Sequence, residues 1–224
     1  MLRYAITDRS QLGATETARR SALLACAVRW AREGIDFVQL RDKDLPAAQL
    51  LDLARDLGAV LRANGSATRL LLNSRVDSHI GLALAAGIDG VHLPSGQQPL
   101  TPARVRQLFA QSGRPSGHKP DRQSAIISIS CHTLDEVQTA ATAGADLILF
   151  GPVFGKSVAV LSGQSVPERR LVTPAIGLDA LRSACALVGT TPVLALGGIT
   201  QANTAACLEA GAAGIAAIRL FQQG

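Results

Sequence analysis

The chain contains few aromatic residues and few cysteines. Aromatic residues make up 3% of its 224 residues, too few for the base-stacking surfaces on which single-stranded nucleic acids bind. The cysteines form neither a CxxC pair nor the spacing of a metal centre, so we interpret them as small buried apolar residues in a reducing compartment. They are Cys26, Cys131, Cys185 and Cys207.

Apolar runs long enough to span a membrane are also missing from the sequence. The chain starts with Met1, Leu2 and Arg3, which lead directly into a strand-like segment and not into a secretory signal. We therefore expect a cytoplasmic protein without a membrane partner. Because 47% of the residues are hydrophobic and 17% are charged, residues 1–224 are expected to form one folded domain.

The net charge of +5 is spread thinly along the chain. Only Lys43, Lys119 and Lys156 are lysines, and the arginines are scattered. This distribution is typical of a solvated surface, so we expect no nucleic-acid partner. A small phosphorylated or carboxylated ligand suits it better, and the sequence leaves homo-oligomer formation open.

Short apolar runs alternate with longer stretches rich in alanine, leucine and arginine. The short runs predict strands at Arg3–Thr7, Asp36–Arg41, Arg69–Asn73, Gly90–Leu93, Ile126–His132, Leu147–Val153, Val193–Leu196 and Gly214–Arg219. The stretches between them predict helices at Ala18–Arg32, Ala47–Ala63, Ser78–Ala86, Thr101–Gln111, Thr133–Ala143, Leu178–Val188 and Gln201–Ala210. Eight apolar strands with helical crossovers predict an α/β fold, a single (β/α)₈ TIM barrel.

Two connections are longer than the rest. Residues 112–123 follow a helix, so we expect a mobile turn without chemistry on the bottom face of the barrel. Residues 155–174 follow the sixth strand and therefore lie on the top face, where barrel enzymes have their active sites. A connection of this length favours a lid over the site.

The second predicted strand separates polar from apolar side chains. Phe37, Gln39, Arg41 and Lys43 share one side of it, whereas Val38 and Leu40 share the other. The polar set is therefore expected to face the barrel interior, with both cations at the upper rim. Cations in that position need an anionic ligand or a carboxylate such as Asp8 or Asp42, and we favour the ligand.

The fifth predicted strand separates in the same way. Ser128, Ser130 and His132 alternate with two isoleucines and Cys131, so the histidine is expected to turn toward the barrel mouth. An imidazole there could transfer a proton at neutral pH. A structural histidine is the alternative that this pattern leaves open.

A glycine pair lies between the seventh strand and its helix. Gly197 and Gly198 would let a phosphate approach the backbone at a helix N-terminus, and barrels often bind phosphate between the last two connections. Arg219, at the predicted end of the last strand, could add a cation. The alternative is a tight turn with a surface arginine.

Together these segments resemble the thiamine phosphate synthase / TenI family of (β/α)₈ barrels, and the resemblance covers nearly the whole chain. Each motif alone is weak, but all of them follow the family's order. They are Tyr4-Ala-Ile-Thr-Asp8, Val38-Gln-Leu-Arg-Asp-Lys43, Asn73-Ser-Arg-Val-Asp77, Gly90-Val-His-Leu93, Ser130-Cys-His-Thr133, Gly144-Ala-Asp146, Phe150-Gly-Pro-Val-Phe154 and Ala195-Leu-Gly-Gly-Ile199.

The resemblance to the synthase branch fails at its metal site. The resemblance implies that a synthase joins a pyrimidine diphosphate to a thiazole phosphate with magnesium held by aspartates. Ser74 and Gln97 stand where two of those aspartates are expected, so a hard cation has lost its ligands. Of the synthase's pyrophosphate loop, Lys156 and Ser157 remain as substitutes.

The thiazole tautomerase branch is more similar at the same points. Leu93-Pro94-Ser95-Gly96 resembles its sequence after the fourth strand, and His132 matches its acid–base histidine. That reaction moves a proton within a phosphorylated thiazole carboxylate and requires no metal. Arg219, where the family has a small residue, departs from both branches.

We therefore favour a thiazole tautomerase-like isomerase that needs no cofactor and binds no metal. The alternatives are a divergent thiamine phosphate synthase, which would need magnesium, and a non-catalytic barrel that binds thiamine-related phosphates. His132 is the predicted acid–base residue. The predicted substrate contacts are Gln39, Arg41, Lys43, Asn73, Ser130 and Lys156, and the predicted phosphate contacts are Gly197, Gly198 and Arg219.

Overall fold

The structure is a computed structural model. It describes the backbone of residues 1–42, 44–96, 99–112, 125–160 and 169–223, and the side chains of the same residues except 156–160 and 169–173. Several predicted features fall outside these ranges. They are Lys43, Gln97, the side chain of Lys156 and most of the 112–123 connection.

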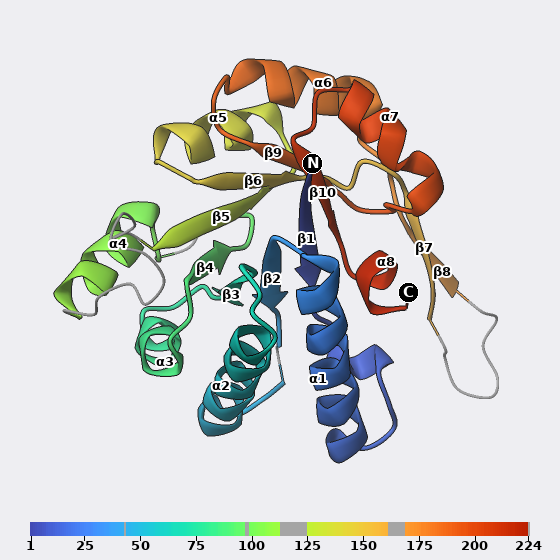
Figure 1. The fold of residues 1–224 in the computed structure, drawn as a ribbon. Coiled ribbons are helices and arrows are strands. Elements are labelled where there is room, and N and C mark those ends of the chain that lie inside the picture. The colour runs from blue at the N-terminus through green and yellow to red at the C-terminus, as the bar shows by residue number, and fades with distance from the viewer. Residues whose placement is uncertain (43, 97–98, 113–124, 161–168, 224) are drawn as a thin grey trace.

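The described strands form a closed parallel barrel (Figure 1). Around the barrel the order is β1-β10-β9-β6-β5-β4-β3-β2, in which each neighbouring pair is parallel. The predicted (β/α)₈ fold is thereby confirmed. The barrel strands are β1 (Leu2–Ile6), β2 (Phe37–Leu40), β3 (Arg69–Asn73), β4 (Gly90–Leu93), β5 (Ile126–Cys131), β6 (Leu147–Phe150), β9 (Val193–Leu196) and β10 (Gly214–Ala217).

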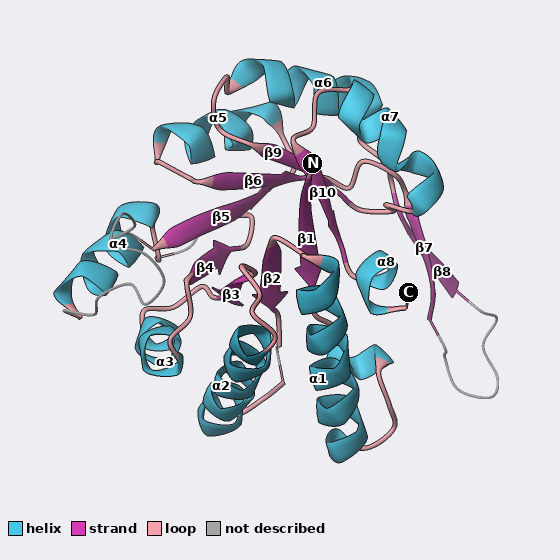
Figure 2. Cartoon of the chain, in the orientation of Figure 1, coloured by secondary structure: helices cyan, strands magenta, loops and turns pink. Residues whose placement is uncertain are grey.

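Helices surround the strands (Figure 2). They are α1 (Glu16–Glu33), α2 (Ala47–Ala63), α3 (Ser78–Ala86), α4 (Pro102–Gln111), α5 (Leu134–Thr142), α6 (Gly177–Leu187), α7 (Thr204–Glu209) and α8 (Arg219–Gln222), with short 3-10 turns η1 (Arg9–Gln11) and η2 (Gln201–Asn203). Within the described residues, no helix combines the length and the apolar character needed to cross a membrane.

Strand alternation produces two cores. Outward-facing side chains such as Val38, Leu72 and Ile148 pack against the helices. Inward-facing side chains form a separate cluster inside the barrel, built from Tyr4, Ile6, Leu147, Leu149, Leu194 and Ala216. Because parallel strands are covered on both faces, both sets of apolar side chains are buried.

Several predicted boundaries are wrong by a few residues at the carboxyl ends of strands. β6 ends at Phe150 and not at Val153, and β5 ends at Cys131, one residue before His132. β10 ends at Ala217, so Arg219 does not close a strand. It begins α8, a helix that apolar periodicity does not reveal because it has only four residues.

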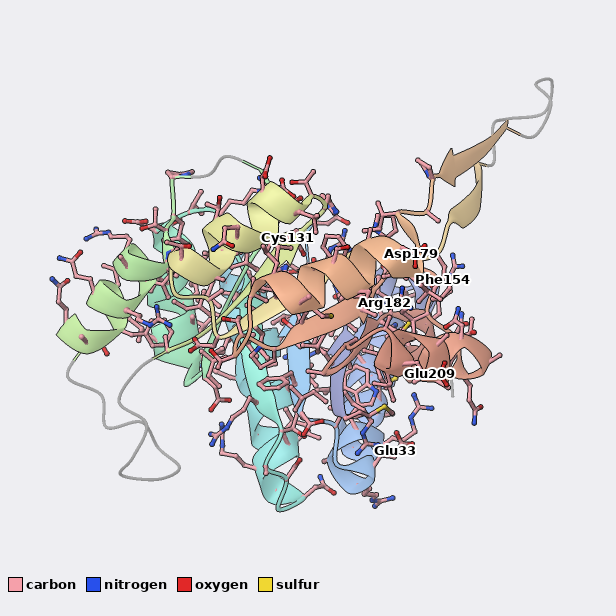
Figure 3. The ribbon with its side chains drawn as sticks, turned by 90° about the horizontal axis from the view of Figure 1, so that it is seen from above. Glu33, Cys131, Phe154, Asp179, Arg182 and Glu209 are labelled. Atoms are coloured by element: carbon pink, nitrogen blue, oxygen red, sulfur yellow. The ribbon has the colours of Figure 1, made fainter. Side chains whose placement is uncertain are left out.

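The long connection after β6 contains a hairpin. β7 (Lys156–Val160) and β8 (Arg169–Thr173) pair antiparallel, outside the barrel sheet. The hairpin extends outward from the ring of helices (Figures 1 and 3). Its closure over the barrel as a lid remains a prediction.

Helix α5 begins immediately after the predicted acid–base residue and carries a capping box. The Thr133 hydroxyl accepts a hydrogen bond from the Glu136 amide, and the Glu136 carboxylate accepts one from the amide of Thr133. The same carboxylate accepts the His132 amide at 2.5 Å. The cap therefore fixes the backbone at the end of β5 as well as the start of the helix.

We expect Thr133→Ala to lower the free energy of unfolding by about 1 kcal/mol, because an N-cap acceptor is lost. Thr139→Ala, on an exposed position of the same helix, is the matched control and should change it by less than about 0.5 kcal/mol. Urea titrations measure both values. Equal losses in the two variants would contradict a stabilising role for the cap.

Candidate active site

The barrel interior is divided into an apolar half and a polar half. Strands β1, β6, β9 and β10 contribute most of the interior apolar cluster. Strands β2 to β5 instead place amide, imidazole and hydroxyl side chains inside, and we call this set the polar sector. It consists of Gln39, Asn73, His92, Ser128 and Ser130.

A buried imidazole joins two serines of the polar sector. His92 Nδ1 lies 2.9 Å from Ser128 Oγ, and His92 Nε2 lies 3.0 Å from Ser130 Oγ. Ser128 Oγ in turn lies 2.8 Å from the hydroxyl of Tyr4. Both serines face inward, as the alternation along the fifth strand predicts, and Cys131 faces the helix layer.

The environment of His92 keeps its ring neutral. The side chain is 3% exposed. Burial lowers the pKa of His92 to about 3, and the positive charge of Arg41 acts in the same direction. Both described hydrogen-bond partners of His92 are serine hydroxyls, so a protonated ring would have no carboxylate partner among them.

A second hydrogen bond links the amides of the polar sector. Gln39 Nε2 donates to Asn73 Oδ1 at 3.0 Å, so the inward direction predicted for Gln39 is confirmed. Gln39 is 2% exposed, and its Oε1 atom has no hydrogen-bond partner among the described residues. A buried amide oxygen without a partner is an acceptor available to a ligand.

Arg41 follows β2 at the rim of the barrel and is half-buried. Its amide donates to Thr7 Oγ1 at 2.9 Å. Of the two carboxylates considered as partners, Asp42 forms its ion pair with Arg9. The carboxyl of Asp8 is partly buried, which opposes ionisation, but hydrogen bonds from Ser10 and Gln11 and the charge of Arg41 together lower the pKa of Asp8.

The guanidinium of Arg41 has no ion pair with any described carboxylate, and the charge of Arg41 influences both Asp8 and His92. A half-buried cation without a bound anion suits a phosphate or carboxylate ligand. The predicted role of Arg41 is consistent with this placement. Lys43 lies outside the described residues, as does the side chain of Lys156.

His132 lies at the rim, outside the buried interior. Its side chain is exposed, and Nδ1 donates a hydrogen bond to the carbonyl oxygen of Gly151, just after β6. Because a carbonyl can only accept, the neutral ring carries its proton on Nδ1 and leaves the Nε2 lone pair free. That atom could accept a proton from a ligand at the mouth.

The glycine pair is pressed against the segment that follows β6. Gly197 has φ +93° and Gly198 has φ +66°, and an added Cβ would lie 2.5 Å from Pro152 and 2.7 Å from Phe154 respectively. Phe154 N donates to Gly197 O at 3.0 Å; Figure 3 labels Phe154. Close backbone packing therefore explains these glycines, and their contact with phosphate remains a prediction.

Arg219 is exposed at the start of α8. It follows β10, which pairs with β9, so it lies near the same end of the barrel as the glycine pair. Because β10 ends at Ala217, Arg219 lies beyond the sheet and outside the barrel interior. Its contact with phosphate also remains a prediction.

Within the described residues, the positions where the family's aspartates are expected offer no magnesium site. Ser74 is buried, and its hydroxyl both donates to Val76 O at 3.0 Å and accepts from Val76 N at 3.1 Å. The nearby carboxylate of Asp77 pairs with Arg104 at 2.9 Å. Across the described part of the chain, no group of three or more acidic, histidine or cysteine side chains could hold a metal ion, and Gln97 lies outside that part.

Comparison with known protein families decides the family. The family model described as thiamine monophosphate synthase matches residues 3–221. The chain belongs to this family. A "Putative thiamine-phosphate synthase" of Geobacter sulfurreducens is 39% identical over 96% of this chain and 84% of its own length.

Other relatives agree with this membership, and a solved structure shares the fold. A "Thiamine-phosphate synthase" of Roseiflexus sp. is 34% identical over 96% of this chain and 75% of its own. A "Putative thiamine-phosphate synthase 2" of Aquifex aeolicus is also 34% identical, over 97% and 96%. The thiamine phosphate pyrophosphorylase from Pyrococcus furiosus shares the fold, with a TM-score of 0.70, 23% identity and coverage of 100% and 88%.

Sequence reasoning missed the central member of the polar sector. His92 was used only as part of a family motif, and Tyr4 and Ser128 received no role. Alternation along β4 shows only that His92 shares a face with Gly90. Its partners follow from the register of β4 and β5, in which His92 lies opposite Ser128.

The depressed pKa predicts a specific acid sensitivity. Unfolded histidine has a pKa of about 6.5, so as the pH falls toward 3 the unfolded chain binds a proton at residue 92 that the folded chain excludes. The contribution of His92 to the free energy of unfolding is therefore complete above the unfolded pKa. Below that pKa it declines by up to about 1.4 kcal/mol per pH unit.

Between about pH 6 and about pH 4, we expect the free energy of unfolding of His92→Gln to fall by about 2 kcal/mol less than that of the unsubstituted protein. Urea titrations at both pH values give the two differences, so any pH-independent loss in the variant cancels. Equal differences in the two proteins would mean that His92 titrates normally in the folded state.

Proposed function

We propose that this protein is an enzyme of thiamine biosynthesis that binds a phosphorylated thiazole at the polar sector. The first candidate reaction is that of a thiamine-phosphate synthase, a transferase. The observation that supports it is the name shared by relatives that are 34% to 39% identical over at least 96% of the chain. These names favour the synthase over the tautomerase that the motifs alone favour.

In the synthase reaction a ring nitrogen of the thiazole phosphate attacks the methylene carbon of the pyrimidine diphosphate. A C–N bond forms, and the C–O bond to pyrophosphate breaks with its electron pair on the departing oxygen. Negative charge therefore develops on the leaving group, and a fixed cation stabilises it. Arg41 is the described residue that supplies such a cation, since it is half-buried and not ion-paired with a described carboxylate.

The magnesium expected for this reaction does not fit the described residues. The hydroxyl of Ser74 is engaged with the backbone of Val76, and the carboxylate of Asp77 is engaged with Arg104. Magnesium requires oxygen ligands, usually carboxylates. We therefore derive no step through a metal.

A specific observation supports a second candidate, the thiazole tautomerase. His132 presents a free Nε2 lone pair at the rim while Nδ1–H is held by Gly151. Moving a proton within a thiazole carboxylate requires such an acid–base group, with cations for the anionic substrate, and no metal. Both candidates act on a phosphorylated thiazole, and only the synthase needs a second substrate, the pyrimidine diphosphate.

One experiment separates the candidates. The purified protein is incubated with the pyrimidine diphosphate plus thiazole phosphate, or with the thiazole carboxylate phosphate tautomer alone, and products are followed by mass spectrometry. Each mixture is run with magnesium and with a chelator. We expect the coupled product, with residual coupling in the chelator because the metal ligands are missing.

Turnover of the tautomer alone would replace the first candidate with the second. Tight binding of thiazole phosphate with no turnover in either mixture would contradict both reactions and support a non-catalytic barrel. Strict dependence of coupling on magnesium would contradict our account of Ser74.

His132→Asn tests the second candidate directly. Asparagine keeps a hydrogen-bond donor for Gly151 O but takes up no proton near neutral pH, so kcat for the tautomer should fall roughly 100- to 10,000-fold. The control His79→Asn changes a histidine on α3, outside the barrel, and should keep kcat. Unchanged kcat in a folded His132→Asn protein, with unchanged melting temperature, would exclude imidazole proton transfer.

A further inference from the structure

We propose that Ser128 and His92 are positioning residues that hold Ser130 as a hydrogen-bond donor toward the ligand. The proposal rests on the proposed function only for the identity of that ligand. The chain of contacts runs from the Tyr4 hydroxyl through Ser128 and His92 to Ser130, with donor–acceptor distances of 2.8, 2.9 and 3.0 Å. The direction in which these hydroxyls and the imidazole donate determines whether Ser130 presents its hydrogen or an oxygen lone pair to a ligand.

The buried end of this chain fixes the direction. Tyr4 is 0% exposed, and its hydroxyl has Ser128 as its hydrogen-bond partner among the described residues. A phenol has one hydrogen to donate, and a buried donor without an acceptor is unfavourable. Tyr4 therefore donates to Ser128 Oγ.

Each following donor has only one remaining acceptor. Ser128 is also fully buried, and its second partner is His92 Nδ1. Its hydroxyl hydrogen therefore points at Nδ1, which must be unprotonated. A neutral imidazole then carries its proton on Nε2, which donates to Ser130 Oγ.

The neutral state of the ring is independently supported. Burial and the charge of Arg41 lower the pKa of His92 to about 3, so both ring nitrogens are not protonated together near neutral pH. The reverse direction, from Ser130 toward Tyr4, would leave the phenol hydrogen without a described acceptor inside the barrel. Only one tautomer satisfies all four groups.

Ser130 then accepts from His92 and keeps its own hydrogen for another partner. It is only partly buried, at the last inward position of β5 before the rim. A fixed donor there favours a ligand atom with a lone pair to spare, such as a carboxylate or phosphate oxygen, and not the thiazole nitrogen whose lone pair forms the new C–N bond. A ligand that presents N–H at this point would be disfavoured.

The tautomer of His92 in the ligand-free protein is the first test. Protein labelled with ¹⁵N-histidine is studied by long-range ¹H–¹⁵N correlation spectra, with His92→Gln used to assign the signal. We expect the Nε2–H tautomer in the unsubstituted protein. The Nδ1–H tautomer would overturn the proposal, and because no ligand is present this outcome is independent of the proposed function.

Tyr4→Phe removes the phenol, and the buried Ser128 hydroxyl is then left with Nδ1 as its only described acceptor. We expect the His92 signal to keep the Nε2–H tautomer, and affinity for thiazole phosphate to change by less than about threefold, because Ser130 still accepts from His92 and keeps its own hydrogen for the ligand. Phe37→Leu is the matched control, since Phe37 stacks on Tyr4 with ring centroids 5.7 Å apart but adds no hydrogen bond. The control should keep the Nε2–H tautomer.

A shift of the His92 signal to the Nδ1–H tautomer in a folded Tyr4→Phe protein would overturn the proposed direction of the chain. The same conclusion would follow if Phe37→Leu shifted the tautomer, because the hydrogen bonds that set the direction remain in that variant. If thiazole phosphate does not bind the unsubstituted protein, the proposed function fails, and the tautomer measurements alone decide this proposal.

Discussion

The hydrogen bonds of one buried imidazole determine how the interior of this barrel is organised. His92 has a serine hydroxyl at each ring nitrogen, so a polar ring can be buried without an unsatisfied nitrogen. This arrangement requires two things of the sequence. His92 must lie opposite Ser128 in the register of β4 and β5, and both serines must face inward.

The rest of the site follows from the division between the two halves of the interior. Leucines of β6 and β9 fill one half together with Ile6 of β1, and the polar sector occupies the other. The unpartnered oxygen of Gln39 and the hydroxyl of Ser130 both lie in the polar half, near Arg41 at its rim. His132 and the glycine pair add groups on the adjoining strand ends, where barrel enzymes carry out their chemistry.

The sequence predicted the barrel and the direction of most inward side chains because both depend on local periodicity. Alternation along single strands was enough for Gln39 and Ser130. It was not enough for His92, whose partners lie on a neighbouring strand. The ends of β6 and β10 and the short helix α8 were also misplaced, since element boundaries depend on tertiary contacts as well as on pattern.

Residue-by-residue reasoning also does not decide between the synthase and the tautomerase reactions. Ser74 and His132 favour a proton transfer without metal, whereas relatives that share a third or more of the sequence carry the synthase name. Both hypotheses require the same ligand-binding surface on the polar sector. The central claim is therefore that the phosphorylated thiazole binds to the polar sector.

A crystal structure of the protein with thiazole phosphate tests this claim most directly. We expect the thiazole phosphate to lie against the polar sector, on the side of β2 to β5, with a polar atom within hydrogen-bond distance of Ser130 Oγ and the phosphate toward Arg41 or the Gly197-Gly198 turn. A ligand bound outside the barrel mouth, or held only by β6 and β9 with Ser130 and Arg41 untouched, would contradict it.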